Sequence, residues 1–541
     1  MRNLIIKNLI IKNYRILKRI FLINITLLVF LAIFFIIFLN FGFYLTLKDL
    51  ISKFLKDEYL SAQEINVNYN LYFYGAVSGI VDGSCYLLSN KNESVIVDIG
   101  SFFSNEQEKN LNNNLDNNLD INKKFSNENI DFKDDLKKLK AIIITHAHDD
   151  HIGRLHYLVY ELYKRNVQDY KIYMTLPTYY IYIQKIKDTI KYSKIPKELK
   201  KIIEKEIINK INIISPNSYF YIGNNIEGYT ILNSHIPGSV SILLNIKNTN
   251  KKILFSGDIG NDFIFHLNPL QYEELNKINP DYLIIESTYG DKNFSYNNEK
   301  EYNKKLQEFL EYINYLKRQK KKVIIPAFAV DRTQKVLFTL LYGVENNIID
   351  NDIKIAIGGK SSQKITQAYL EMINNPLYDI FFNKQKINFN ITYKNKIWYF
   401  DRFKESELDR LDEKISKYDV IISPSASGES SDSKVLLNRF LYDSKVVVIK
   451  VSWTPPNSLV SKIFKNNYNS YNRNYSELFS SHADKKSLIK YIKNLKHDNL
   501  KTIIITHGSN LARDSLEIEI KNNFKNISIL KPNYADKITI K

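Results

Sequence analysis

Residues 145–153 read Thr-His-Ala-His-Asp-Asp-His-Ile-Gly and directly follow the apolar run 141–144, which reads as a buried strand. Four side chains of this loop can ligate a metal: His146, His148, Asp150 and His151. Imidazole and carboxylate groups suit Zn²⁺ and related divalent cations, and alternate residues after a strand project in different directions. One loop can therefore supply ligands to two adjacent cations. A solvated polar turn, the ordinary alternative, does not require so many histidines and carboxylates in one place.

The composition limits the kinds of metal site and of partner. The 541 residues include a single cysteine, Cys85, which excludes an intramolecular disulfide and a cysteine-rich zinc site. Any metal must therefore be held by histidines and carboxylates. The formal net charge of +18 favours a polyanionic partner, because Lys and Arg displace the counterions of phosphates. Heavy use of Lys, Asn, Ile and Tyr along the whole chain explains the same excess without a nucleic-acid surface.

The N-terminal segment predicts a membrane anchor. Residues 20–47 carry no charged side chain and exceed the ~20 residues that span a bilayer, and no signal-peptide cleavage site follows. The tail 1–19 has six basic residues and no acidic one, whereas the linker 48–66 mixes both signs. The positive-inside rule then predicts a single-pass membrane protein with its tail in the cytoplasm and its catalytic part outside.

Beyond the linker, the pattern predicts an α/β fold. Short apolar runs that read as strands alternate with amphipathic stretches that read as helices, which indicates layered sheets. Residues 105–135 are rich in Asn, Asp, Lys and Glu and predict a solvated surface insertion.

Three more motifs accompany the loop: Val-Asp-Ile-Gly at 97–100, His-Ile-Pro-Gly-Ser at 235–239 and Phe-Ser-Gly-Asp at 255–258. In their order along the chain, these motifs and the loop resemble the metallo-β-lactamase superfamily. The resemblance implies an αββα sandwich. It also implies that Asp98 supports the metal shell, that His235 is a ligand and that Asp258 bridges two metals.

Four later motifs indicate a branch of that superfamily: Ile-Glu-Ser-Thr-Tyr-Gly at 285–290, Ile-Pro-Ala-Phe-Ala-Val-Asp-Arg-Thr-Gln at 325–334, Phe-Ser-Ser-His-Ala-Asp at 479–484 and Thr-His-Gly at 506–508. They resemble the β-CASP RNA-processing nucleases, which include the 3′-end-processing endonuclease and ribonuclease J. The match assigns Glu286 to motif A, His482 to motif B and His507 to motif C. A histidine at motif C resembles the members that act on RNA.

The resemblance implies a complete set of ligands for two Zn²⁺ ions, or for other divalent ions: His146, His148 and His235 for one, Asp150, His151 and His507 for the other, and Asp258 between them. Such a pair supplies a bridging hydroxide for phosphodiester hydrolysis. His482 would protonate or stabilise the leaving oxygen, and Glu286 would orient its ring. Asp98, Glu286 and His482 are therefore the predicted catalytic residues.

The resemblance also predicts the domain limits. The hydrolase domain would span 67–290, a β-CASP domain would be inserted at 291–478, and the hydrolase domain would return at 479–541.

Six of the nine histidines lie in the motifs. The remaining three are predicted to be ordinary surface or core residues: His156, His266 and His497.

Some positions depart from the family pattern. Asp149 adds an acid among the ligands, Asp331 replaces a common glycine, and residues 424–433 replace a more glycine-rich substrate loop. Acids near a phosphate path would repel it, so these departures bear on substrate preference.

The features together predict a metal-dependent hydrolase of phosphodiester bonds that acts on nucleic acid, with RNA favoured. A membrane-anchored di-zinc hydrolase of another ester or phosphodiester outside the cytoplasm is the alternative that the outward topology favours. A third interpretation is a non-catalytic, membrane-tethered binding protein, against which the retention of every ligand argues.

Overall fold

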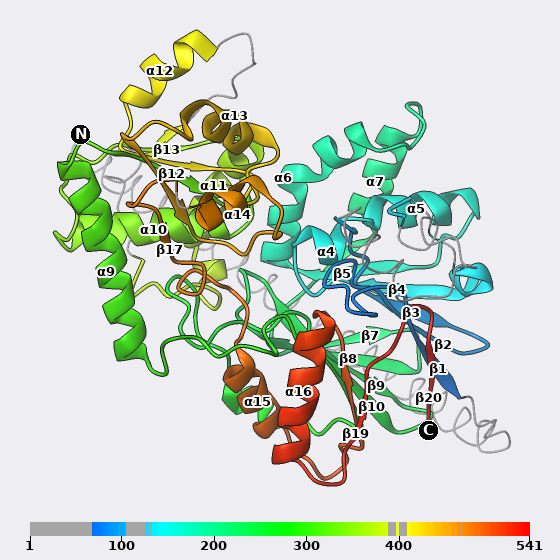
Figure 1. The fold of residues 1–541 in the computed structure, drawn as a ribbon. Coiled ribbons are helices and arrows are strands. Elements are labelled where there is room, and N and C mark those ends of the chain that lie inside the picture. The colour runs from blue at the N-terminus through cyan, green and yellow to red at the C-terminus, as the bar shows by residue number, and fades with distance from the viewer. Residues whose placement is uncertain are drawn as a thin grey trace, which may run out of the picture. The chain divides into compact units, whose positions relative to one another are not determined.

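The computed structural model describes residues 68–103, 126–128, 130, 132–387, 397–399, 408–466 and 468–541. These residues form three β-sheets with helices on their faces (Figure 1). The layered α/β fold that the sequence predicts is therefore confirmed.

The first two sheets have seven strands each and pack face to face. The first sheet has the order β20 (Lys537–Ile540), β1 (Tyr69–Phe73), β2 (Tyr86–Ser89), β3 (Ser94–Val97), β4 (Leu139–Ile143), β5 (Lys171–Thr175) and β6 (Ile211–Ile214). The second has the order β19 (Ser528–Leu530), β18 (Thr502–Ile505), β11 (Tyr282–Ile285), β10 (Lys251–Phe255), β9 (Val240–Ile246), β8 (Ile226–Leu232) and β7 (Tyr219–Ile222). Alternate residues of β1 point inward, so Leu71 and Phe73 share one core with Ile242 and Leu244 of β9.

Helices cover the outer faces of this sandwich, which gives the αββα order. The first sheet is covered by α5 (Leu155–Lys164), α6 (Leu176–Tyr192) and α7 (Lys200–Lys210). The second is covered by α15 (Lys485–Lys493) and α16 (Asn510–Asn523). Each helix buries one apolar stripe, as Leu158 does on α5 and Leu488 on α15. Three short elements lie in the connections: η1 (Lys133–Lys138), α4 (Asp149–Ile152) and α8 (Tyr272–Leu275).

The third sheet has six strands, and all its pairings are parallel. Its order is β14 (Ile397–Tyr399), β13 (Ile355–Ile357), β15 (Val420–Ser423), β12 (Lys322–Pro326), β16 (Val446–Lys450) and β17 (Arg473–Asn474). One face packs against α9 (Glu299–Arg318), α10 (Arg332–Glu345), α11 (Lys360–Ile373) and η2 (Pro376–Tyr378). The other face packs against α12 (Leu408–Ser416), α13 (Ser431–Phe440) and α14 (Leu459–Asn466).

Two neighbouring strands of the second sheet are separated in the sequence by the whole third sheet. Strands β11 and β18 pair in parallel, with Tyr282 opposite Thr502 and Ile285 opposite Ile505. All strands of the third sheet lie between them in the sequence. Glu286, which follows β11, and His507, which follows β18, therefore begin their loops side by side.

The prediction of a single-pass membrane protein requires correction. Among the residues that the structure describes, none of the helices combines the length and the apolar character needed to cross a bilayer. The segment 20–47, on which the prediction depended, lies outside the described residues.

The end of the polar stretch 105–135 is packed against the hydrolase core. Ile130 and Phe132 are 3% and 4% exposed and belong to the core under the first sheet. Because their neighbours in the sequence are polar, the burial of these two residues is not evident from the sequence. The prediction of a solvated surface insertion is therefore wrong for this end of the stretch. Residues 105–125 of the same stretch lie outside the described residues.

Candidate metal centre

The predicted site residues meet at the carboxyl ends of strands in both sheets of the sandwich. Asp98 follows β3, and His146 follows β4, its parallel neighbour. Asp258, Glu286 and His507 follow β10, β11 and β18, three successive parallel strands of the second sheet. Parallel neighbours end at the same edge of a sheet, which explains why residues far apart in the sequence converge here.

The structure brings all seven predicted ligands together in two groups that share Asp258: His146, His148 and His235 in one, and Asp150, His151 and His507 in the other. Within each group, the ligand atoms lie within 4.8 Å of one another. The grouping is the one that the resemblance implies.

Each oxygen of the Asp258 carboxylate faces one group. Oδ2 lies 3.6 Å from His146 Nε2 and 3.5 Å from His235 Nε2. Oδ1 lies 3.1 Å from His151 Nε2 and 3.4 Å from His507 Nε2. A carboxylate placed in this way can bridge two cations.

The arrangement of the ligand nitrogen and oxygen atoms suits bound divalent cations better than direct contacts between the side chains. Both Asp258 oxygens are buried and make no hydrogen bond with the described residues. His148 Nδ1 lies 3.2 Å from His146 Nε2 and 3.1 Å from His235 Nε2, so three ring nitrogens converge on one point. Burying a carboxylate that accepts no hydrogen bond is costly, and a cation bound by nitrogen and oxygen donors removes that cost.

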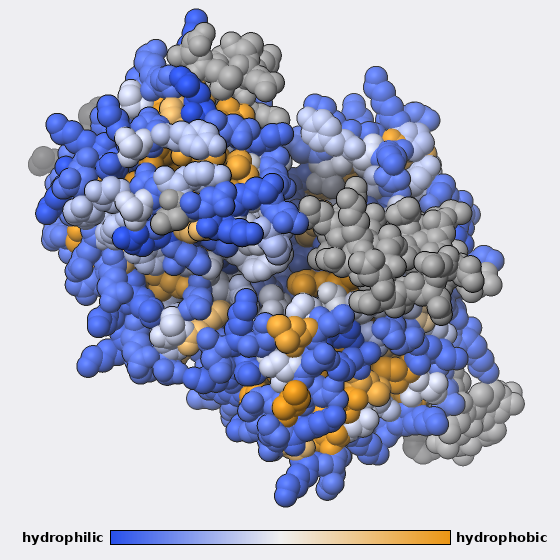
Figure 2. Space-filling model, viewed as in Figure 1, coloured by the Kyte–Doolittle hydropathy of each residue, from blue (hydrophilic) through white to orange (hydrophobic). Residues whose placement is uncertain are grey.

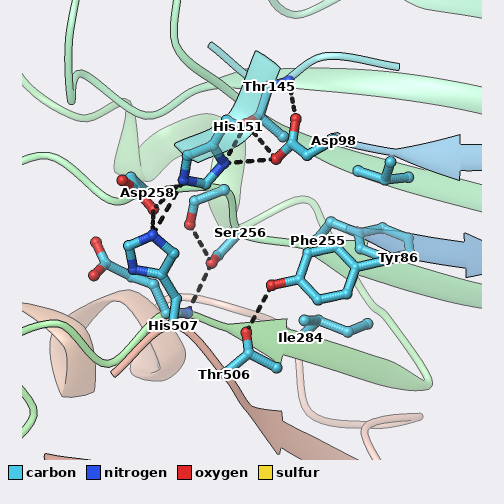
Figure 3. Close-up of a pocket in the computed structure, with 13 residues that line it drawn as sticks. Tyr86, Asp98, Thr145, His151, Phe255, Ser256, Asp258, Ile284, Thr506 and His507 are labelled. Carbon is cyan, nitrogen blue, oxygen red and sulfur yellow. Dashed lines mark hydrogen bonds and ion pairs between the residues drawn. The ribbon is translucent and has the colours of Figure 1, made fainter. Parts of the chain in front are cut away.

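Asp98 lies behind the ligands and holds His151 in place (Figure 3). Its Oδ2 is 2.7 Å from His151 Nδ1 and accepts a hydrogen bond from the Thr145 hydroxyl, whereas its Oδ1 accepts one from the Thr145 backbone nitrogen, both at 2.8 Å. The Nδ1 of His151 is therefore occupied, and its Nε2 faces Asp258. Such a carboxylate fixes the tautomer and raises the basicity of a ligand histidine.

Two other ligand histidines are held through their remaining ring nitrogens. His507 Nδ1 lies 3.0 Å from Thr288 Oγ1, and His235 Nδ1 lies 3.1 Å from the backbone oxygen of Ser481. These contacts orient the rings before any cation binds.

Unlike most of the ligand histidines, His482 is partly exposed to solvent. Its side chain is 19% exposed, whereas those of His146 and His235 are fully buried. Its Nδ1 lies 3.3 Å from Glu286 Oε1 and 3.9 Å from Asp258 Oδ2. Glu286 in turn accepts hydrogen bonds from the backbone nitrogens of Ile259 and Thr288, at 2.6 and 3.2 Å. The carboxylate is thus fixed, and it orients a histidine that solvent reaches.

Burial and charge act in opposite directions on the histidines of the two groups. Burial lowers the pKa of His146 and His235 well below the usual range and lowers the pKa of His148, which favours the neutral form that ligates metal. At His507, burial also opposes the charge, but Asp258 and Asp150 raise its pKa to about 9. The carboxylates therefore favour a positive charge at the second group.

Two acids that depart from the family pattern are both neutralised. Asp149 is half-exposed and pairs with the Lys185 ammonium group. Asp331 is 1% exposed and pairs with His266. Each acid therefore has a basic partner from a distant part of the chain, and an effect of these acids on substrate preference stays a prediction.

His266, which the sequence predicts to be an ordinary surface or core residue, forms a buried hydrogen-bonded pair with Asp331. It is fully buried, its Nε2 lies 2.7 Å from Asp331 Oδ1, and Asp331 Oδ2 accepts a hydrogen bond from Ser481 Oγ. The one available signal was Asp331 itself, an acid where the family has glycine. The other two remaining histidines fit the prediction of ordinary residues: His156 is buried on α5, and His497 bonds to the backbone oxygen of Ile492.

Comparison with known proteins agrees with this geometry. Residues 78–284 match the metallo-beta-lactamase superfamily, and residues 472–532 match the Zn-dependent metallo-hydrolase RNA specificity domain. The chain belongs to the β-CASP branch of the metallo-β-lactamase superfamily. It is therefore placed among metal-dependent hydrolases of the nuclease family.

Several relatives of this β-CASP protein align over much of its length. It is 25% identical over 470 residues to RNase aCSPSF2 of Saccharolobus solfataricus, covering 85% of this chain and 83% of that protein. It is 29% identical over 413 residues to an RNase J-like protein of Methanocaldococcus jannaschii, covering 73% and 87%. With endoribonuclease ysh1 of Schizosaccharomyces pombe it shares 24% identity over 410 residues, covering 72% of this chain and half of the yeast protein.

The relatives also overturn the predicted localisation. They are named as ribonucleases and RNA-processing enzymes, which does not agree with a catalytic part held outside the cytoplasm by a membrane anchor. The single-pass, extracytoplasmic assignment and the membrane as a partner are therefore wrong for this β-CASP protein.

Proposed function

We propose that this β-CASP protein is a two-metal ribonuclease that hydrolyses phosphodiester bonds of RNA. The observation that carries the proposal is the position of Asp258, whose two oxygens face two separate groups of ligands beside a solvent-reachable histidine. The match to an RNA specificity domain and the names of the relatives support RNA as the substrate class.

The proposed metal site holds two divalent cations, with zinc favoured by the nitrogen-rich donor set. The first would bind His146, His148 and His235, the second would bind Asp150, His151 and His507, and Asp258 would join them. When bound, two such ions make a water acidic enough to lose its proton near neutral pH and neutralise the charge that develops on the phosphate.

The chain's own residues would handle the leaving group. Glu286 is fixed by two backbone nitrogens and accepts a hydrogen bond from His482 Nδ1. That contact leaves His482 Nε2 for the substrate. As the bond between phosphorus and the leaving oxygen breaks, His482 Nε2 would donate its proton to that oxygen, and Glu286 would keep the ring aligned.

We also propose that residues 67–290 and 479–541 form the hydrolase domain, that 291–478 form the β-CASP domain, and that RNA crosses the carboxyl edge of the third sheet. Two exposed aromatic residues, Phe328 and Trp453, follow the parallel neighbours β12 and β16 and are 48% and 52% exposed. Aromatic side chains of this kind stack on nucleobases. The face shown in Figure 2 is mostly hydrophilic.

The test is a substrate panel with the purified full-length chain. Labelled single-stranded RNA, DNA of the same sequence and bis(p-nitrophenyl) phosphate would be incubated with the wild type and with Asp258→Ala. We expect cleavage of RNA that is lost in the variant and restored in the wild type by Zn²⁺ after chelation. Turnover of the small diester without cleavage of RNA would contradict this proposal and would indicate a general phosphodiesterase.

A further inference from the structure

A buried hydrogen-bonded chain leads from the interior of the molecule to the loop that carries His482. His266 Nε2 lies 2.7 Å from Asp331 Oδ1, which also accepts a hydrogen bond from Tyr369 at 3.3 Å. Asp331 Oδ2 accepts a hydrogen bond of 2.8 Å from Ser481 Oγ. Ser481 directly precedes His482.

Ser481 also touches the first metal group. Its backbone oxygen lies 3.1 Å from His235 Nδ1 and accepts a hydrogen bond of 3.1 Å from the backbone nitrogen of Asn261. One residue therefore connects Asp331 through its side chain and His235 through its backbone. A shift of Ser481 would move both His482 and the ring of His235.

The N-terminus of α10 holds the same loop at a second place. Asp331 precedes α10, and Lys335 lies one turn further along that helix. Lys335 Nζ donates to the backbone oxygens of Ser480 and Phe479, at 2.8 and 3.3 Å. Because α10 packs against the third sheet, these contacts join that sheet to the catalytic loop.

We propose that His266 and Asp331 are positioning residues that hold Ser481, and through it His482 and His235, in the geometry that the reaction needs. This inference rests on the proposed function, since it assigns the pair to the same site. Neither residue is within reach of the substrate, because both are buried. Their effect on the reaction passes through Ser481.

The chemistry of the pair supports this role. Burial raises the pKa of the Asp331 carboxyl, but His266 and Lys335 more than offset that effect and keep it ionised. A charged carboxylate is a stronger and more directional acceptor than a neutral group. It therefore fixes the Ser481 hydroxyl more firmly than apolar packing would.

The test compares Asp331→Ala, Asp331→Asn and His266→Phe with the control Asp281→Asn. Asp281 is also buried and accepts a hydrogen bond of 2.9 Å from the backbone nitrogen of Lys252, but it lies at the opposite end of β11 from Glu286. We expect kcat on RNA to fall about 10- to 100-fold in Asp331→Ala and His266→Phe, as for other residues that orient metal ligands. Asp331→Asn keeps one acceptor oxygen, so its kcat should fall less. KM should stay within about twofold of the wild type in all these variants. The control Asp281→Asn should keep the wild-type kcat even if its melting temperature falls by a similar amount.

Two further measurements separate positioning from simple stabilisation. Competition with a chelator should show weaker Zn²⁺ binding in Asp331→Ala, and this measurement needs no substrate, so it tests the pair even if RNA is not cleaved. Ser481→Ala combined with Asp331→Ala should cost little more than Asp331→Ala alone, because both changes remove one contact. Unchanged kcat and Zn²⁺ affinity, or a loss of kcat that the control shares, would overturn the proposal.

Discussion

Replacing His482 by alanine tests the division between metal binding and proton transfer in the proposed site. The seven predicted ligands fill two groups without His482, whose side chain is 19% exposed. His482→Ala should therefore keep the metal content of the wild type. Loss of a general acid typically costs about 10² to 10⁴-fold, or roughly 3 to 5 kcal/mol, and the loss should be in kcat with KM little changed.

Glu286 gives the internal check on that magnitude. Its Oε1 lies 3.3 Å from His482 Nδ1, a long contact that orients the ring without sharing its proton strongly. Glu286→Gln keeps the size of the side chain and should lower kcat by about tenfold, a typical cost of losing an orienting carboxylate. If Glu286 acts only through His482, the double variant should be little slower than His482→Ala.

The assay is single-turnover cleavage of a labelled RNA, with metal content measured by elemental analysis on the same samples. His497→Ala is the matched control, since this ring bonds to the backbone oxygen of Ile492 and stacks on Phe524, beyond the C-terminal end of α15. Full additivity of the two losses would show that Glu286 acts elsewhere. Loss of one metal in His482→Ala would show that Asp258, Glu286 and His482 form a metal site of their own, because their ligand atoms also lie within 4.8 Å.

Three further predictions concern the metals, the pH dependence of stability and the substrate surface. The chain should retain about two divalent ions after dialysis, and His146→Ala about one, by elemental analysis; a wild-type stoichiometry below one would contradict the ligand assignment. Burial and the neighbouring Arg332 lower the pKa of Lys335 from 10.5 to about 7. Between these pH values the unfolded chain binds one more proton than the folded chain. The free energy of unfolding should therefore rise with pH across that range. Lys335→Met should remove that contribution in urea denaturation at pH 7 and pH 9 with chelator present, and identical pH slopes in both proteins would refute it. Trp453→Ala should raise KM for RNA by about fivefold or more through lost stacking, whereas Tyr442→Ala, an exposed aromatic residue before β16, should not change it in the same assay.

The candidate metal site could be predicted from the sequence because its motifs follow apolar runs and resemble those of a known family. His146 and Asp258 follow the apolar runs 141–144 and 253–255, and these runs are easily recognised as buried strands. Once the runs are parallel neighbours, their ends must meet. The local sequence therefore contains most of the information on where the ligands lie.

The surroundings of the site could not be predicted in the same way. His266 and Asp331 are 65 residues apart, and Asp331 and Ser481 are 150 residues apart, so no local pattern joins them. Ile130 and Phe132 were hidden in the same way by polar neighbours. Contacts of this kind depend on how separate elements pack, and the sequence shows only that each residue is compatible with burial.

The pairing of β11 with β18 explains why contacts across the inserted region matter to the reaction. Glu286 and His507 leave adjacent strands, whereas His482 lies in the loop where the chain returns from the third sheet. Strand pairing therefore fixes Glu286 and His507 directly, but His482 depends on tertiary contacts of its own loop. Those contacts come from Gly260 on one side and from Asp331 and Lys335 on the other. Because no strand pairing fixes His482, its position depends on contacts with residues next to the third sheet. A change of Asp331 should therefore lower the rate of the reaction, and not only the stability of the fold.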